Sequence, residues 1–79
     1  MSDRRLKWQC RRGMRELDVL LSGYLEKTYP ASDDASKQAF RRLLELSDPE
    51  LNALLLGGIK SADTDIAHAV ALVRGETRP

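Results

Sequence analysis

The sequence has few of the residues that cross-link small proteins. It contains one cysteine, Cys10, and one histidine, His68, among 79 residues. A single cysteine excludes an internal disulfide framework, and these two side chains cannot supply the four ligands of a structural zinc site. We therefore predict a chain without a metal site, suited to a reducing compartment.

Long apolar runs are also missing. No uninterrupted apolar stretch, such as residues 53–56, approaches the about 20 residues needed to span a bilayer. The first residues lack the apolar segment of a signal peptide. We therefore expect a cytoplasmic protein that does not associate with a membrane.

Aromatic residues are scarce, with one tryptophan, two tyrosines and one phenylalanine. The core must therefore consist mainly of leucine, alanine and valine. Apolar residues recur at helical spacing, and no window shows the sustained alternation of a strand. The pattern predicts an all-α fold, a compact five-helix bundle forming a single domain over residues 1–79, with residues 1–3 and 76–79 frayed.

Breaks in the pattern delimit the five predicted helices. The first covers roughly residues 3–11, and the second runs from residue 14 until Pro30 stops it. The third opens at a cap on Ser32 or Asp33. The fourth begins with a capping box from Ser47 to Glu50, or with an Asp48 cap followed by Pro49 at the first helical position. The last begins after a cap at Asp63. The residues predicted to form the apolar faces of the last four helices are Met14, Leu17, Leu20, Leu21, Tyr24, Leu25, Ala35, Ala39, Phe40, Leu43, Leu44, Leu46, Leu51, Leu54, Leu55, Leu56, Ile66, Ala69, Val70 and Val73.

Charge is unevenly distributed along the chain. The formal net charge is only +1, but residues 1–15 contain six basic residues and one acidic residue, a local charge of +5. The remainder therefore carries −4. This asymmetry predicts a basic entry segment on a mildly acidic body.

The densest group of unusual residues spans positions 8–18. If the first helix continues to Arg12, Trp8 shares its face with four arginines. The favoured interpretation packs the indole against a neighbouring helix under the arginine stems, and the alternative is an exposed aromatic set among guanidinium groups.

Two further residues of this group suit a contact surface. Glu16 falls in the first turn of the second helix, where the helix dipole favours a carboxylate, and it can pair with Arg12. It lies outside the apolar arc, beside Val19 and Gly23, in a strip that suits contact with another protein. Gly13 can end the first helix, and its missing side chain also permits close approach of a partner.

The remaining reactive residue types have structural interpretations. Cys10 is expected to be a small core residue, His68 a plain helical residue, and the Arg41-Arg42 pair a solvated helix face. No phosphate-binding loop, nucleophile elbow or metal signature is present in the sequence. We assign no catalytic residue and predict that the chain is not an autonomous enzyme.

The same group of residues resembles a known family, the small FAD assembly factors of succinate dehydrogenase of the SdhE or YgfY type. The resemblance covers residues 5 to about 74, and its diagnostic element is the R-G-x-x-E motif at residues 12–16. The matching positions are Trp8, Cys10, Arg11, Arg12, Gly13, Met14, Glu16, Leu17, Asp18, Tyr29, Phe40, Leu43, Leu44, Asp48, Pro49, Glu50 and Leu51.

The resemblance implies a factor that binds the flavoprotein subunit of succinate dehydrogenase, or of fumarate reductase, and promotes covalent attachment of FAD to a histidine of that subunit. It implies no catalytic role and no tightly bound cofactor, with the FAD attached to the partner. The residues carried over by motif position are Arg12, Gly13 and Glu16 for partner binding and flavinylation, with Trp8, Arg11, Arg15 and Asp18 as neighbouring contacts.

Two other functions stay open at this point. The basic segment and Trp8 also fit a small nucleic-acid-binding or antitoxin-like regulatory helical protein. The total charge of +1 and the lack of helix-turn-helix spacing argue against it, so nucleic acid is not the expected partner. The third possibility is an adaptor bundle unrelated to flavin, or a factor that binds free FAD itself.

Overall fold

The computed structural model describes residues 3–76 and confirms the predicted five-helix, all-α fold. Within that range it contains five α-helices, one short 3-10 helix and no strand. The elements are α1 (Asp3–Gln9), α2 (Arg15–Lys27), η1 (Tyr29–Ala31), α3 (Asp34–Leu43), α4 (Asp48–Leu55) and α5 (Thr64–Arg74).

The predicted frayed ends fall mainly outside these residues. Residues 1–2 and 77–79 lie beyond the described range. Asp3 already belongs to α1, and the backbone N–H of Glu76 donates to the carbonyl of Ala71 at 2.8 Å. This last bond follows Gly75, whose φ of +78° ends α5 in a left-handed cap.

Three helices begin at polar caps that the sequence predicts. Asp33 accepts a hydrogen bond from the N–H three residues later, at 2.8 Å, ahead of α3. Ser47 and Glu50 form a reciprocal capping box at α4. Asp63 accepts from two backbone N–H groups of the first turn of α5. The structure thus selects Asp33 and Ser47 from the alternatives that the pattern left open.

Two helix ends differ from the predictions. The first helix stops at Gln9 rather than near residue 11, because the N–H of Arg11 bonds to the carbonyl of Trp8 in a tighter turn, at 3.1 Å. The second helix stops at Lys27, three residues before Pro30. Pro30 has no N–H to continue the hydrogen-bond pattern of α2, and residues 29–31 form the separate 3-10 helix η1.

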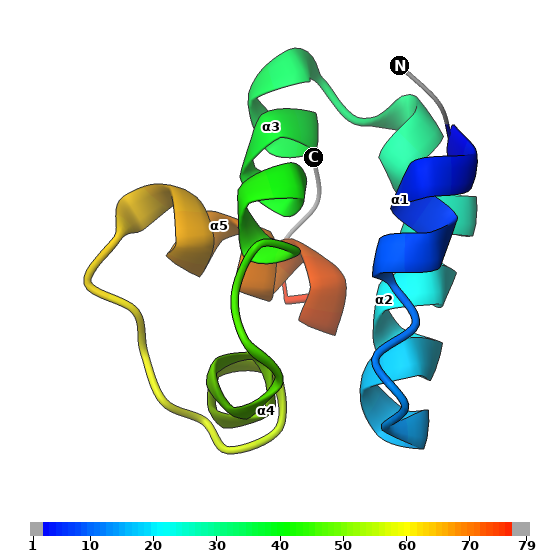
Figure 1. Cartoon of the computed structure of the whole chain (residues 1–79). Helices are drawn as coiled ribbons and strands as arrows, with labels where there is room; N and C mark the ends of the chain where they lie inside the picture. The colour runs from blue at the N-terminus through cyan, green and yellow to red at the C-terminus, as the bar shows by residue number, and fades with distance from the viewer. Residues whose placement is uncertain (1–2, 77–79) are drawn as a thin grey trace.

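Helix α2 connects the two sides of the molecule. Figure 1 shows α1 beside α2 on one side, α3 and α5 together on the other, and α4 viewed end on. α2 packs against α1, η1, α4 and α5, while α3 packs chiefly against α5. One face of α2 is therefore buried by contacts with four elements.

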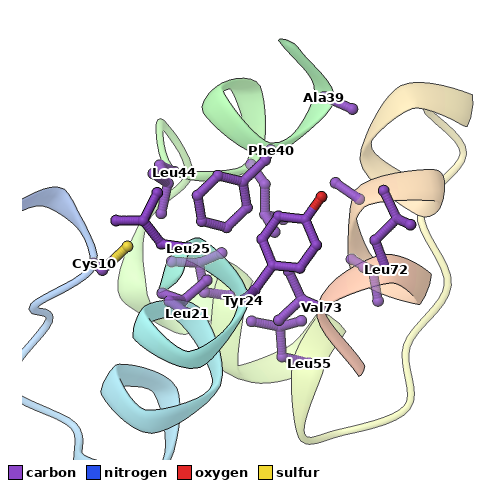
Figure 2. Packing of buried hydrophobic residues seen from close by; sticks show 14 of the residues in the cluster. Cys10, Leu21, Tyr24, Leu25, Ala39, Phe40, Leu44, Leu55, Leu72 and Val73 are labelled. Carbon is purple, nitrogen blue, oxygen red and sulfur yellow. The ribbon is translucent and has the colours of Figure 1, made fainter. Parts of the chain in front are cut away.

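Three aromatic residues form the centre of the core, and Figure 2 shows the rings of two of them, Tyr24 and Phe40. The ring of Phe40 lies 4.7 Å from that of Tyr24 and 5.6 Å from that of Tyr29, measured between centroids. Phe40, Leu17 and Leu21 are among the largest fully buried side chains. The leucine-rich core predicted from composition is confirmed, with these rings packed inside it.

Five residues assigned to apolar faces are not fully buried. Ala35 and Leu56 are exposed, whereas Met14, Leu20 and Leu46 are half-buried against the core. Ala35 is only the second residue of α3. Leu56 follows the last residue of α4, and the helical period of about 3.6 residues per turn places it away from the buried Leu51 and Leu54. For Ala35 and Leu56 the prediction was wrong.

The packed position favoured for Trp8 is also wrong, because 77% of this side chain is exposed. Leu6 and Cys10, one turn apart, occupy the buried side of α1. Trp8 lies two residues from each and therefore on the opposite side of the helix. Its indole is part of the surface and contributes little to the core.

Arg42 adds ion pairs to the solvated face predicted for the Arg41-Arg42 pair, and 42% of its side chain is exposed. The Arg42 guanidinium bonds to Asp63 at 2.6 Å and to Asp65 at 2.7 Å, tying α3 to the start of α5. Backbone bonding within the cap, and then Arg42, lowers the pKa of Asp63. The pair of ion bridges reinforces the α3–α5 contact.

The contrast between Phe40 and Trp8 predicts opposite effects of the same truncation. Phe40→Ala should lower the free energy of unfolding by about 3–5 kcal/mol, which is most of the stability of a small domain. Trp8→Ala should change it by less than about 0.5 kcal/mol. Urea titrations followed by circular dichroism measure both. Equal losses for the two variants would contradict the packing described here.

Candidate functional site

The connection between α1 and α2 is a short turn fixed at its centre by a glycine. Gly13 has φ +79°, a conformation that other residues adopt at a cost of about 1–2 kcal/mol. A Cβ built on this glycine meets no atom within 4 Å. The backbone conformation therefore favours glycine, and the space beside it is open to an approaching surface.

The residue before this glycine is anchored through its main chain. The backbone N–H of Arg12 donates to Asp18 Oδ1 at 2.6 Å. Asp18 belongs to the first turn of α2, where a carboxylate is also favoured by the helix dipole. This bond holds the turn against the start of α2, whose cap residue Met14 makes no side-chain capping bond.

The side chain of Arg12 is anchored to the connection between α3 and α4. Its guanidinium donates to the carbonyls of Leu44 and of Leu46, the latter at 3.2 Å, and lies 3.5 Å from Asp48 Oδ1. Only 17% of the side chain is exposed. The ion pair predicted with Glu16 is therefore wrong for the described residues, since Arg12 pairs with Asp48.

The motif thus separates into buried and exposed parts. Gly13 and Glu16 are both exposed, as are the neighbouring Arg11 and Arg15. Asp18 is half-buried. Trp8 shares α1 with Arg4 and Arg5, but the helix ends before Arg11 and Arg12, so the predicted arginine set around Trp8 is only partly formed. The predicted site residues that lie at the surface are Trp8, Arg11, Gly13, Arg15 and Glu16.

A surface hollow of about 470 Å³ adjoins Glu16 on α2. The strip predicted on this side is present, since Val19 is 64% exposed beside the carboxylate. Leu56, from the end of α4, also lines the hollow. Sequence patterns do not indicate this contribution, because Leu56 lies 40 residues from Glu16 and is grouped with the apolar residues of its own helix. The lining residues are Arg15, Glu16, Val19, Leu20 and Leu56.

Cys10 lies in the core directly beside the junction, as predicted. Its side chain is fully buried, and this burial raises the pKa of the thiol to about 11, with Arg12 lowering it and Asp18 raising it. The reactive thiolate is therefore scarce at neutral pH. Cys10 supports the packing of α1 and does not present a nucleophile at the surface.

The other reactive side chains give no further centre. His68 is exposed on α5, with Nε2 3.2 Å from Ser36 Oγ. Among residues 3–76 no three histidine, cysteine or carboxylate side chains are placed to share a metal ion. No helix in that range has the length and apolar character required to cross a bilayer.

The fold and the junction define the class: a small all-α domain whose candidate site is an exposed helix-to-helix turn with an adjoining hollow. Residues 4–77 match the family described as "Flavinator of succinate dehydrogenase". The chain belongs to this family.

Several proteins that are similar to most of this chain are named "FAD assembly factor SdhE". The protein from Shewanella oneidensis is 43% identical over 79 residues, which cover all of this chain and 96% of the relative. That from Idiomarina loihiensis is 42% identical over 67 residues, 85% of this chain and 74% of the relative. The protein from Yersinia pseudotuberculosis is 39% identical over 74 residues, which cover 94% of this chain and 84% of the relative. The resemblance predicted from the motif is confirmed.

Burial of Cys10 predicts a loss of stability in alkali. The unfolded thiol releases its proton at about pH 8.5, whereas the folded one keeps it until about pH 11. Because the folded state binds more protons in this window, the free energy of unfolding should fall as the pH rises from 9 to 11.

Urea titrations at several pH values measure this slope, and Cys10→Ala is the control because it removes the titrating group. The free energy of unfolding of this variant should depend less steeply on pH. Tyr24, whose pKa is also raised by burial, should account for the dependence that remains. An unchanged slope in Cys10→Ala would rule out the buried thiol as the cause.

Proposed function

We propose that this chain binds the flavoprotein subunit of succinate dehydrogenase, or of fumarate reductase, and promotes the covalent attachment of FAD to it. The family supports the connection with succinate dehydrogenase and with FAD. The observation that carries the proposal is the exposed turn, where Gly13 has open space beside it and Glu16, three residues later, is exposed. A partner can approach the backbone closely there and pair a cation with the carboxylate.

Charge and shape support a protein surface as the partner. The exposed face combines the basic groups Arg11 and Arg15 with Glu16, and it adds apolar area from Val19 and Leu56. Mixed charge beside apolar side chains is typical of the rim and centre of a protein interface. Trp8, exposed on α1, adds an aromatic contact of the kind enriched at such interfaces.

The proposed role is positioning rather than catalysis. On binding, the factor holds the flavoprotein in a conformation where the acceptor histidine faces the C8 methyl group of the isoalloxazine and charge on the flavin is stabilised. Orientation of this kind can lower a barrier without a reacting group from the factor. The FAD is the substrate of the attachment and stays with the partner, and the buried Cys10 takes no part.

Enlarging Gly13 should abolish this function. The change Gly13→Arg fills the open space, so covalent flavin on a co-expressed flavoprotein subunit should fall at least tenfold. Flavin fluorescence of the denatured subunit measures the attachment, and co-purification measures the binding.

Gly58→Arg is the matched control for this experiment. Gly58 has φ +76° and open space at its Cβ, so the substitution introduces the same side chain and the same backbone strain elsewhere. It should leave flavinylation near the wild-type level. Equal losses in both variants would show that strain, and not the junction, limits function.

The carboxylate of Glu16 gives a second test. Glu16→Gln should weaken binding of the flavoprotein subunit several-fold because a charge that faces the partner is lost. Glu26→Gln, an exposed neutralisation on the same helix, should have little effect. Binding that is insensitive to Glu16→Gln contradicts the proposed contact.

Failure of the wild-type chain to bind or flavinylate the subunit would overturn the whole proposal. A steeply salt-dependent shift of RNA or DNA by the isolated chain would then favour the nucleic-acid alternative. Quenching of Trp8 fluorescence by free FAD would instead favour direct flavin binding.

A further inference from the structure

The arginine of the R-G-x-x-E motif differs from its exposed neighbours because its guanidinium is occupied inside the molecule. Nη1 and Nη2 donate to the carbonyls of Leu46 and Leu44, and Nη1 also faces Asp48. The remaining donor, Nε, is buried and has no hydrogen-bond partner among the described residues. The nitrogens of Arg12 are therefore committed inside the chain or shielded from an approaching protein.

We propose that Arg12 is a positioning residue that clamps the α1–α2 turn to the α3–α4 connection, and that Asp48 is the other half of this clamp. Arg12 then serves partner binding indirectly, by fixing how Gly13 and Glu16 are presented. This inference rests on the proposed function for its effect on binding. The clamp itself can be tested in the free protein.

The groups that face the Arg12 guanidinium carry negative or partial negative charge. Leu44 caps the C-terminus of α3, where carbonyls lack helical partners and the helix dipole is negative. Asp48 begins α4, adding a carboxylate within reach. A planar guanidinium offers several donors in one fork and can bond to carbonyls and a carboxylate together, which an ammonium group does less well.

Arg12 is held both through its backbone N–H and through its side chain. The Arg12 N–H is held by Asp18 of α2 at 2.6 Å, and its side chain is held by residues 44–48. Gly13 follows directly, with its backbone in the left-handed region. Two anchors before this glycine restrict the direction in which the chain enters α2, and Glu16 lies one turn further along.

The pairing joins two motifs that are separate in the sequence. Asp48 belongs to the Asp48-Pro49-Glu50 segment, 36 residues after Arg12. That segment also contains half of the α4 capping box, formed by Ser47 and Glu50. Loss of the cap and loss of the clamp can therefore be separated by substitutions at adjacent positions.

The first test uses the free protein and NMR amide spectra. Asp48→Asn removes the charge that faces Arg12, and it should shift the Gly13 and Glu16 amide resonances. Ser47→Ala removes the cap of the same helix without touching Arg12 and should leave both resonances in place. Unshifted resonances in Asp48→Asn, or equal shifts in both variants, overturn the clamp.

The second test is a double-mutant cycle on affinity for the purified flavoprotein subunit. Arg12→Ala should weaken binding at least tenfold and Asp48→Asn at least threefold, and the double variant should bind no more weakly than Arg12→Ala alone. Arg11→Ala, an exposed charge loss at the next position, should give a separate, additive effect. Arg12→Lys keeps the charge and should retain part of the affinity, which provides a folded variant if Arg12→Ala unfolds.

Additive effects of Arg12 and Asp48, or normal binding by Asp48→Asn, would assign Arg12 to direct contact with the partner and overturn the positioning role. Weakening by Ser47→Ala equal to that by Asp48→Asn would attribute the effect to general stability and also overturn it. If the wild-type chain does not bind the subunit, the proposed function fails, and the amide spectra still decide the clamp.

Discussion

The arrangement of the surface turn depends on one guanidinium, that of Arg12, which is largely shielded from solvent. Helices α2, α3 and α4 all end or begin near Arg12, and each terminus leaves backbone groups without helical partners. Arg12 satisfies carbonyls at the end of α3, offsets a carboxylate at the start of α4, and has its own N–H bound at the start of α2. A chain of 79 residues has a small core. A polar contact that joins three helix ends therefore contributes strongly to fixing the positions of these ends.

Helix α2 carries both the centre of the core and the edge of the candidate site. Leu17, Leu21 and Tyr24 face inward, while Glu16 and Val19 are exposed. Because these residues share one rigid helix, the packing around Phe40 determines where the exposed strip lies. A partner that binds the strip therefore contacts an element held by four others, which reduces the entropy lost on binding.

Local signals made most of the fold predictable, and distant contacts account for what was not. The caps at Asp33 and Asp63 and the glycine turn depend on neighbours within a few residues, so their sequence patterns suffice. The partners of the Arg12 side chain lie at least 32 residues away, and no periodicity specifies them. The sequence pattern groups Leu56 with the neighbouring core leucines, but the helical period places it beyond Leu55 on the exposed side. For the candidate site, the motif positions could be predicted, but not which of them face outward.

The pairing of Arg12 with Asp48 also changes what the basic N-terminal segment offers to a partner. One of its six basic residues, Arg12, is matched by Asp48 from the acidic body, so the charge at the surface is smaller than the sequence sum of +5. Glu16 and the half-buried Asp18 follow directly and reduce it further. Attraction to a polyanion scales with the number of free cations, whereas a protein interface depends on complementary charges around an apolar centre. Mixed charges beside Val19 and Leu56 therefore suit selective docking on a folded protein better than binding along a phosphate backbone.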